Sequence, residues 1–336
     1  MRSRALPPVP LCAPPILLCA LTLAACGGGS SRAHRASAAT HRTSRIAIRK
    51  PSPRLVYRPL YHLAAAVEDP ASAPLGNGRF VLLGGLTPAD TSTADVIVAG
   101  LHGELGHATL PNAQHDAQAA ALGGQVYLFG GGQYAQYDHI LRFDPATNAV
   151  NSAGVLPAPA SDVAVAGDGS TAYVVGGFDG SAWLDTIVAY APGAPPRVVA
   201  RLPVPLRYAA ATIAGGYLLI AGGSTPSGVS DSVLRYDPRT GRLATLARLP
   251  RGITHAAAGV LGRTMYLVGG RGDSVSAKTD AILAIDPVTG EIRSAGRLPQ
   301  PLSDAAVVSL GSRLIVAGGS ADGGIQAAVG ELEPSP

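Results

Sequence analysis

Residues 80–85 read FVLLGG, a short apolar run that ends in a pair of glycines. The same pattern returns five more times along the chain. The pairs end at Gly85, Gly131, Gly177, Gly223, Gly270 and Gly319, at intervals of 46, 46, 46, 47 and 49 residues. A fixed period of this length is typical of repeated supersecondary units. The sequence therefore predicts six structural units.

Two further markers keep the same period. A Leu-Pro pair follows each of the first five glycine pairs, at Leu110, Leu156, Leu202, Leu249 and Leu298. An Asp-Pro turn follows the third apolar run in three of the units, at Asp144, Asp237 and Asp286. Because three markers recur in step, we interpret the units as true repeats rather than chance glycine pairs.

Each unit reads as four short strands. In the fourth unit the runs are RYAAATIA, YLLIAGG, SVLRYDP and RLATLARLP, bounded by Gly or Pro turns. The first strand is rich in alanine, and in the first unit we assign it to 64–66. Strands nearest a propeller axis crowd one another, so small side chains suit them. Blades stacked around an axis also bury sheets that could not bury both faces alone. We predict an all-β, six-bladed β-propeller.

The glycine pairs, the Tyr-Asp-Pro turn at Tyr236 and the Leu-Pro pairs resemble kelch repeats over residues 59–336. The resemblance implies a kelch-like propeller of the galactose-oxidase type. Kelch repeats usually carry a tryptophan several residues after the tyrosine. The matching positions here hold Val150, Leu243 and Ile292, and the single tryptophan is Trp183. This departure affects the subfamily rather than the propeller itself.

The last unit has too few strands. After Gly319 it has one more apolar run, near 326–332, and then ends at Pro336. The segment Arg54–Val67 resembles Arg197–Thr212, which contains the outer strand of another unit. We therefore predict that residues 53–58 supply the outer strand of the last blade.

The N-terminus reads as an export signal. Two arginines precede an apolar stretch at 11–25, which ends in Leu23-Ala24-Ala25-Cys26 and is followed by a Gly/Ser run. That tetrapeptide resembles the lipobox of bacterial lipoproteins, which implies that Cys26 is acylated. The alternative is an ordinary signal peptide in which Cys26 is incidental. We predict a signal peptide at 1–25, a lipid-anchored basic linker, disordered for most of its length, at 26–52, and a propeller at 53–336.

The charge is divided between two regions. Residues 1–58 carry ten Lys or Arg and no Asp or Glu, whereas residues 59–336 carry 16 basic and 22 acidic side chains, a balance of −6. An acidic body argues against nucleic acid as a partner. The basic segment lies beside the predicted anchor, where anionic lipid headgroups would attract it. A solvated linker without membrane contact is the alternative.

Polar residues recur just ahead of the alanine-rich strands. Six residues after the leucine of each Leu-Pro pair lie Asp116, Asp162, Tyr208, His255 and Asp304, with His62 as the approximate equivalent in the first unit. We interpret these positions, with two preceding neighbours, as a mouth that binds a ligand or partner: His62, His115, Asp116, Asp162, Arg207, Tyr208, His255 and Asp304. The other interpretation is that they bond the backbone between blades.

No pattern for a metal site, a cofactor or a catalytic residue is present, so we predict none of these. Galactose oxidase chemistry needs a tyrosine linked to cysteine and a copper ion. The mature chain would keep only Cys26, because Cys12 and Cys19 lie in the signal peptide. That chemistry is therefore excluded, as are a disulfide and a cysteine nucleophile in the body.

These features favour an extracytoplasmic, monomeric lipoprotein, held at the bacterial cell membrane by its lipid and basic linker. Its propeller would be a non-catalytic binding scaffold for an envelope protein or a carbohydrate. The alternative is a carbohydrate-active enzyme similar to the sialic-acid epimerases, with Arg207 holding a carboxylate and His255 moving a proton. A third possibility is a structural part of an envelope complex. Carboxylates that converge in a deep pocket beside a basic residue would favour the enzyme.

Overall fold

The computed structural model describes residues 53–335. The predictions for the signal peptide, for Cys26 and for the basic linker at 26–52 concern residues outside this range. Between 53 and 335 the chain forms strands and turns without a helix, as the all-β prediction requires. This range accordingly contains no helix with the length and apolar content needed to span a membrane.

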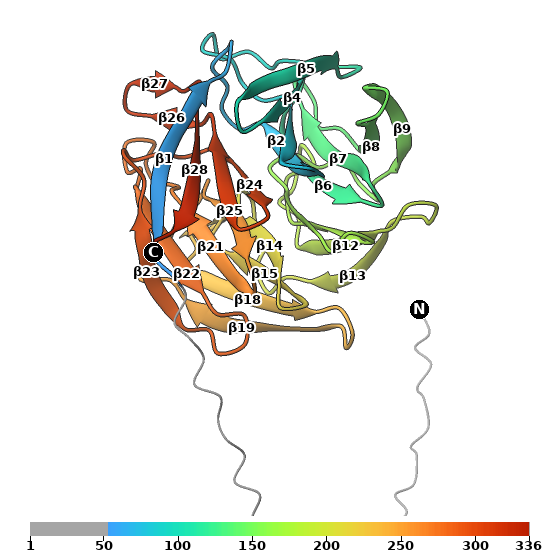
Figure 1. Ribbon diagram of the computed structural model, residues 1–336. Helices are drawn as coiled ribbons and strands as arrows, with labels where there is room; N and C mark the ends of the chain where they lie inside the picture. Colours follow the sequence, from blue (N-terminus) through green and yellow to red (C-terminus); the bar gives the residue numbers. More distant parts are fainter. Residues whose placement is uncertain (1–52, 336) are drawn as a thin grey trace, which may run out of the picture. The chain divides into compact units, whose positions relative to one another are not determined.

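Six four-stranded antiparallel sheets form the blades (Figure 1). From the axis outward they contain β2 (Ala71–Gly76), β3 (Arg79–Leu83), β4 (Asp95–Gly100) and β5 (Gly103–Thr109); β6 (His115–Leu122), β7 (Gln125–Gly132), β8 (His139–Asp144) and β9 (Ala149–Val155); β10 (Ala164–Gly167), β11 (Ala172–Val175), β12 (Thr186–Tyr190) and β13 (Arg197–Arg201); β14 (Ala210–Ala214), β15 (Tyr217–Ala221), β18 (Ser232–Asp237) and β19 (Arg242–Arg248); β20 (Ala257–Leu261), β21 (Thr264–Val268), β22 (Ala281–Ile285) and β23 (Ile292–Arg297); and β24 (Ala306–Leu310), β25 (Arg313–Ala317), β28 (Ala328–Pro334) and β1 (Leu55–His62).

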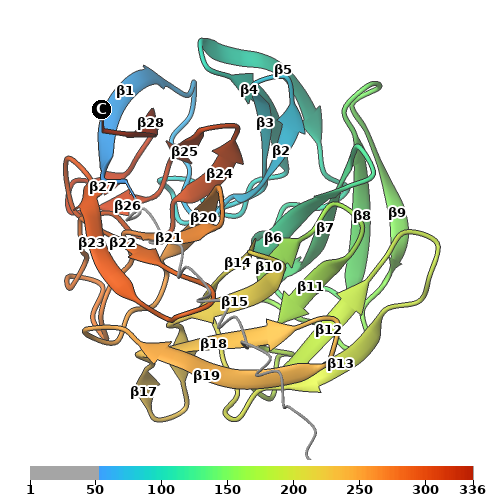
Figure 2. The ribbon, with the colours of Figure 1, turned by 60° about the horizontal axis from the view of Figure 1, so that its bottom comes forward.

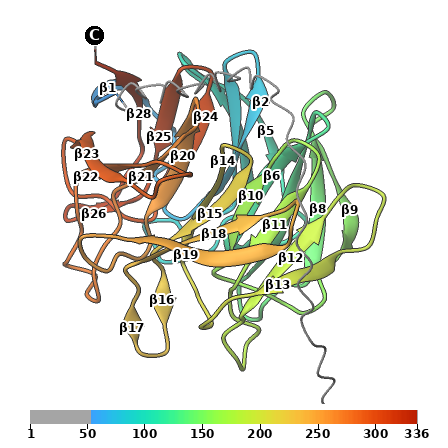
Figure 3. The same ribbon diagram turned by 90° about the horizontal axis from the view of Figure 1, so that it is seen from below.

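Figure 2 shows the first strands of the blades gathered around a common centre, with the fourth strands at the rim. Two small hairpins extend the loops after the glycine pairs of blades 4 and 6. They are β16 (Ser224–Thr225) with β17 (Gly228–Val229), and β26 (Ser320–Ala321) with β27 (Gly324–Ile325). The β16–β17 hairpin projects from its blade (Figure 3). The predicted six-bladed propeller is confirmed.

The N-terminal strand closes the last blade. β1 pairs antiparallel with β28 from Leu55 opposite Pro334 to His62 opposite Ala328, with an irregularity between Pro59 and Tyr61. The pairing confirms the prediction for residues 53–58, and the strand runs four residues further. Gly330 of β28 leaves room for the ring of Tyr57, which would overlap any Cβ at this position. The first and last strands of the propeller therefore lie in one sheet.

The first strand of blade 1 begins later than predicted. Residues 64–66 lie in the connection between β1 and the blade, and the inner strand β2 starts at Ala71. The alanine triplet imitates the inner strands at Ala210 and Ala257. However, the chain must first cross from the outer edge of blade 6 to the axis, and residues 63–70 make that crossing.

The core lies between neighbouring blades. One cluster joins Val81 and Val96 of blade 1 to Ala119, Leu128 and Phe143 of blade 2, all buried. Alanine on the inner strand leaves space for the larger side chains of the middle strands. The predicted crowding at the axis explains this distribution, because inner strands of adjacent blades are in contact all around the ring.

Each glycine pair fastens its blade to the next one. In blade 4 the Gly223 amide donates to the carbonyl oxygen of Ile253, at 2.8 Å, in the chain that enters blade 5. The same bond joins Gly85 to Gln114, Gly131 to Ala160, Gly177 to Leu206, Gly270 to Leu302 and Gly319 to Val67. Gly222 has a φ of 66°, and a Cβ there would overlap the Ile253 oxygen. Positive φ and close approach together explain why glycine recurs here.

Candidate functional site

Six residues form a ring around the axis, just before the inner strands; we call them the mouth ring. Each has a positive φ, between 51° and 59°, which is uncommon outside glycine and recurs at functional sites. The mouth ring consists of Asp69, Asp116, Asp162, Tyr208, His255 and Asp304. Five of them were predicted from the sequence.

Blade 1 contributes Asp69 to the mouth ring, not His62. The Val67 oxygen accepts the glycine-pair bond of blade 6, as the Gln114 oxygen accepts that of blade 1. The ring residue follows two positions later, which gives Asp69 and Asp116. His62 ends β1 and is exposed. The assignment of His62 was therefore wrong, because the crossing segment lengthened the first unit.

Backbone hydrogen bonds connect the mouth ring. The amide of each ring residue donates to the carbonyl oxygen of the ring residue before it, at 2.7–3.1 Å, from Asp162 round to Asp69. The circle closes differently, because the Asp116 amide donates to Oδ2 of Asp69 at 2.7 Å. Inter-blade bonding, the alternative function considered for these positions, is thus present and is carried mainly by backbone. The ring side chains make further contacts of their own.

Behind the ring lies an axial cavity of about 270 Å³. Its mouth carries the ring side chains, and its wall consists of the inner strands, which are rich in alanine at 119–121, 209–211 and 256–258. An acidic mouth therefore leads to a wall of mostly small side chains, in which Ser72, Gln118 and Thr212 lie among the alanines. Such a shape suits a small molecule held by a few polar groups.

Arg207 is bound within the protein. Its guanidinium forms an ion pair with Asp162, whose side chain is 1% exposed. The guanidinium carbon also lies 4.7 Å from the ring centre of Phe178 and 4.8 Å from that of Trp183. These contacts hold Arg207 in place between an aspartate and two aromatic rings. The geometry of Arg207 is that of an internal salt bridge, not of a free guanidinium.

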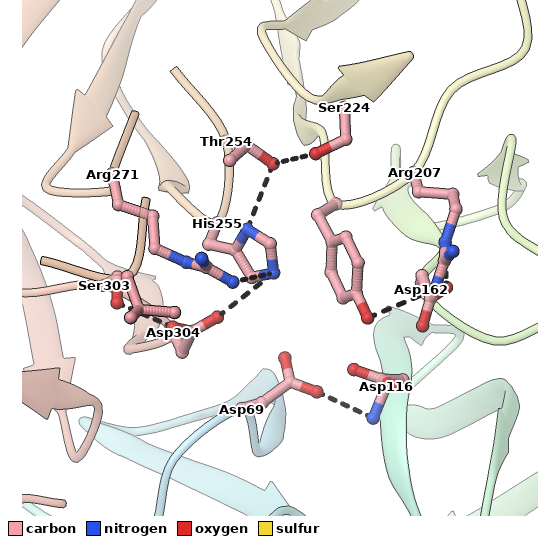
Figure 4. A network of polar contacts seen from close by, with 12 residues as sticks. Asp69, Asp116, Asp162, Arg207, Ser224, Thr254, His255, Arg271, Ser303 and Asp304 are labelled. Carbon is pink, nitrogen blue, oxygen red and sulfur yellow. Dashed lines mark hydrogen bonds and ion pairs between the residues drawn. The ribbon is translucent and has the colours of Figure 1, made fainter. Parts of the chain in front are cut away.

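His255 lies at the centre of a second network (Figure 4). Its Nε2 is 2.9 Å from Nη2 of Arg271, and its Nδ1 is 3.0 Å from Oγ1 of Thr254. Because a guanidinium can only donate, Nε2 accepts and Nδ1 carries the proton. The imidazole also stacks on the ring of Tyr208, with centroids 3.9 Å apart. Asp304 lies 3.9 Å from Nε2 and accepts a hydrogen bond from Ser303.

His115 lies at the edge of the mouth. Its Nδ1 bonds Oγ of Ser92 at 2.9 Å, and its Nε2 lies 3.4 Å from Oδ2 of Asp116. All the predicted mouth residues except His62 thus lie at or beside the ring. No group of three or more His, Cys, Asp or Glu side chains in the described part of the chain is arranged to hold a metal ion.

The repeated sequence pattern has counterparts in known proteins. A family model described as "Kelch motif" matches residues 205–242, which cover β14 to β18 and the Tyr-Asp-Pro turn. The body of the chain is a kelch-repeat propeller. Kelch-like protein 35 of Mus musculus is 32% identical over 148 residues, 43% of this chain and 25% of that protein. The chain therefore matches a quarter of the length of this curated relative.

A solved structure titled "Structure of YjhT" has the same fold. It superposes with a TM-score of 0.69 at 17% sequence identity, over 81% of this chain and 95% of that one. At this identity the likeness concerns the fold alone. The kelch propeller thus has a known architecture, and the evidence for its function comes from the residues of the mouth ring.

Electrostatics at the mouth of the kelch propeller follows from burial. Burial and the neighbouring Asp116 raise the pKa of Asp162 to about 7, although Arg207 lowers it. Burial and Asp116 also raise the pKa of Asp69 well above its usual value, and burial raises that of Asp304 to about 6. Burial, Arg271 and Arg207 lower the pKa of His255 to about 3. At neutral pH Asp162 is therefore partly protonated, and the imidazole of His255 is neutral.

Replacing Arg207 by alanine is expected to lower the free energy of unfolding by about 3 kcal/mol, because a buried carboxylate loses its cation. Arg248→Ala is the matched control, since it removes an exposed pair with Asp231 and should change stability by about 1 kcal/mol or less. Urea denaturation of both variants measures the difference. Equal, small effects would show that Arg207 has no structural role.

Protonation of His255 should contribute a loss of stability in acid. The folded-state pKa lies below the usual 6.5, so the folded state binds fewer protons, and stability falls as the pH drops from about 6.5 towards 3. The slope for one proton is at most about 1.4 kcal/mol per pH unit. His255→Gln should lose less stability than wild type between pH 7 and pH 4.5 in urea titrations. Asp162 and Asp304, with raised pKa values, act in the opposite direction in both proteins. Parallel pH profiles would contradict the assignment.

Sequence reasoning missed Asp69, Arg271, and the contacts of Phe178 and Trp183 with Arg207. Phe178 and Arg271 each follow a glycine pair directly, and each forms a β-bridge to the residue before a ring position. The residue after each glycine pair could therefore have been predicted from the repeat to lie near the mouth ring. Trp183 had no such signal, because it lies in a loop of variable length.

Proposed function

We propose that this chain is a lipoprotein of the bacterial cell envelope whose kelch propeller is a non-catalytic binding scaffold. The observation that carries the binding role is the mouth ring, in which four carboxylates lie over a cavity of about 270 Å³. Acidic side chains at the entrance of a concave site suit recognition of a ligand or of a partner's side chain.

Two contacts argue for binding rather than catalysis. The enzyme alternative needs Arg207 free to hold a substrate carboxylate, but its guanidinium is paired with Asp162. It also needs His255 to exchange protons, but its Nε2 already accepts a hydrogen bond from Arg271, and a pKa of about 3 makes the imidazole a weak base. The residues chosen for that chemistry are thus engaged in the fold.

One observation favours the carbohydrate-active enzyme as second candidate. Asp116 interacts with both Asp69 and Asp162, Asp162 is paired with Arg207, and the pKa of Asp162 lies at about 7. A carboxyl group with such a pKa can donate or accept a proton at neutral pH. The test of function therefore has to distinguish a bound compound from a converted one.

A thermal-shift screen of sugars and small metabolites can make this distinction. A ligand of the mouth should raise the melting temperature of wild type and of the rim control Asp231→Ala, but not of Asp116→Ala. Mass spectrometry after incubation should recover the compound unchanged. Conversion of the compound would establish the enzyme instead. A shift that persists in Asp116→Ala, or no shift with any compound, would contradict a binding mouth.

The lipid anchor is a separate part of the proposal and has its own test. Cys26→Ser should leave the propeller folded and release it from the membrane fraction, because the thiol that takes the lipid is absent. Labelled palmitate should be incorporated into wild type only. Incorporation that persists in the variant would rule out lipidation at Cys26, without affecting the binding role of the mouth.

A further inference from the structure

The face opposite the mouth carries a surface of different charge. The mouth ring lies at the start of the first strands, and neighbouring strands within a blade are antiparallel. The turns that join the first strand to the second, and the third to the fourth, therefore lie at the other face. In blades 4 and 5 these turns and the strand ends beside them carry five arginines, which we call, together with Tyr217 and Val288, the basic patch: Arg235, Arg239, Arg242, Arg263 and Arg293.

Tyr217 lies at the centre of the basic patch. The guanidinium carbon of Arg235 is 4.8 Å from the centre of its ring, and that of Arg239 is 5.7 Å from it. Nη2 of Arg239 also lies 3.5 Å from the Tyr217 hydroxyl. Arg263 of blade 5 reaches the turn just before Tyr217, because a Cβ on Gly215 would lie 3.3 Å from its Nη2. Guanidinium groups from two blades thus lie around one aromatic ring.

The basic patch has an excess of positive charge. Three acidic residues lie in the same turns. Asp237 pairs with Arg239, and Glu291 pairs with Arg293. The third, Asp286, accepts two backbone amides of its own turn. The other three arginines of the patch form no ion pair with an acidic side chain in the described part of the chain.

The patch is open to solvent and combines charge with apolar surface. The side chain of Arg239 is 74% exposed, and Val288, in the turn between β22 and β23, is 43% exposed. Arg235 is held by bonds to the carbonyl oxygens of Pro287 and Val288, at 3.1 and 3.3 Å. Tyrosine and an aliphatic side chain among arginines suit the surface of an anionic membrane. There a guanidinium can bind phosphate, and an aromatic ring can lie at the level of the headgroups.

The chain enters the propeller at the same face. Leu55 lies opposite Pro334, at the end of β28 that is away from the mouth, and its carbonyl oxygen approaches Gly296 of blade 5. Arg54, just before it, is exposed. Residues 1–58 contain ten basic and no acidic side chains. The segment that leads into this face is therefore basic, as is the patch on it.

We infer that the basic patch docks on an anionic lipid surface, with Arg239 and Arg263 binding headgroup phosphates and Val288 inserted among the headgroups. The inference concerns a different surface from the mouth. It rests on the proposed location in the cell envelope, but not on lipidation of Cys26 or on the binding role of the mouth. Four turns of two blades contribute to the patch, so its cations are spread over a surface and suit a membrane better than one small anion. Docking by this face would leave the mouth free on the other side.

Vesicle binding by the full-length protein tests the inference. All proteins carry Cys26→Ser, so that a lipid on Cys26 cannot contribute. In a flotation assay the parent protein should bind vesicles of equimolar phosphatidylglycerol and phosphatidylcholine. It should bind pure phosphatidylcholine vesicles about tenfold more weakly or worse, a difference of about 1.4 kcal/mol or more. Added salt should release the protein. Equal binding to both kinds of vesicle, or binding to neither, would overturn the inference.

Matched double variants show whether the patch is responsible. Arg239→Gln with Arg263→Gln removes one arginine paired with an aspartate and one without an acidic partner, and should weaken vesicle binding about tenfold or more. Arg248→Gln with Arg251→Gln removes the same two kinds of arginine from the mouth side, and should change binding by less than about twofold because charges away from the membrane are screened. Equal effects of the two double variants would mean that the N-terminal segment or the net charge alone governs binding, and the inference would be wrong.

Tryptophan emission reports whether the patch reaches the lipid. Emission from Val288→Trp should move to shorter wavelength on the anionic vesicles, after subtraction of the Trp183 signal of the parent protein. Val275→Trp is the control, since Val275 is 66% exposed in a loop on the mouth side, and its emission should not move. An unshifted Val288→Trp would overturn the inference and favour an acidic protein as the partner of the patch. These measurements involve no ligand of the mouth, so the inference and the proposed binding role fail or succeed separately.

Discussion

Gly222→Ala is expected to lower the free energy of unfolding by about 3 kcal/mol or more. A left-handed backbone costs an alanine about 1–2 kcal/mol, and Gly222 has a φ of 66°. The new Cβ would also overlap the carbonyl oxygen of Ile253, which accepts the inter-blade bond from Gly223. Relief of that overlap must move two blades apart, so the bond and the packing around it are weakened together.

Gly241→Ala is the matched control for this prediction. Gly241 has a similar φ of 70°, but a Cβ there meets no atom within 4 Å. Its substitution should therefore cost only the backbone term, about 1–2 kcal/mol. Urea denaturation of both variants gives the comparison. Equal losses would mean that the glycine pairs recur for their backbone conformation alone, and not because the blades approach closely.

Removal of β1 is the second large effect. A chain that starts at Leu63 should lose about 5 kcal/mol of stability relative to wild type, since seven residue pairs with β28 disappear at up to about 1 kcal/mol for each hydrogen bond lost. The buried Leu55 leaves the core between blades 5 and 6 at the same time. The exposed edge of β28 should also promote aggregation.

A chain that starts at Pro53 separates this effect from loss of the N-terminal segment. It keeps β1 and should melt at the temperature of the full-length protein. Calorimetry or circular dichroism at equal concentration compares the two truncations. Equal melting temperatures for chains starting at Pro53 and at Leu63 would show that β1 contributes nothing to the closed propeller.

The fold could be predicted because its key constraints are local. A glycine such as Gly222 is needed wherever the backbone takes a positive φ against a neighbouring carbonyl, so the pattern repeats in every blade. The closing strand was also predictable, since the last unit lacked an outer strand and residues 53–58 resembled one. The first unit was misread because 64–66 has the composition of an inner strand but lies in the crossing segment.

The site was less predictable, because it depends on contacts between blades. The repeat predicted that Asp162 and Arg207 lie in consecutive blades. It did not predict that the two side chains form an ion pair. It also gave no indication that Trp183, noted only as a tryptophan in an unusual position, would lie against Arg207. Side-chain pairing across blades depends on loop length and rotamer, which no periodic pattern specifies.

The direction of β1 has a mechanical consequence. The strand enters at Leu55, opposite Pro334, and reaches the mouth side of the propeller only at its other end, where His62 leads to Asp69. A pull on the N-terminal segment is therefore applied at the face opposite the mouth, and first to the pairs that close the last blade.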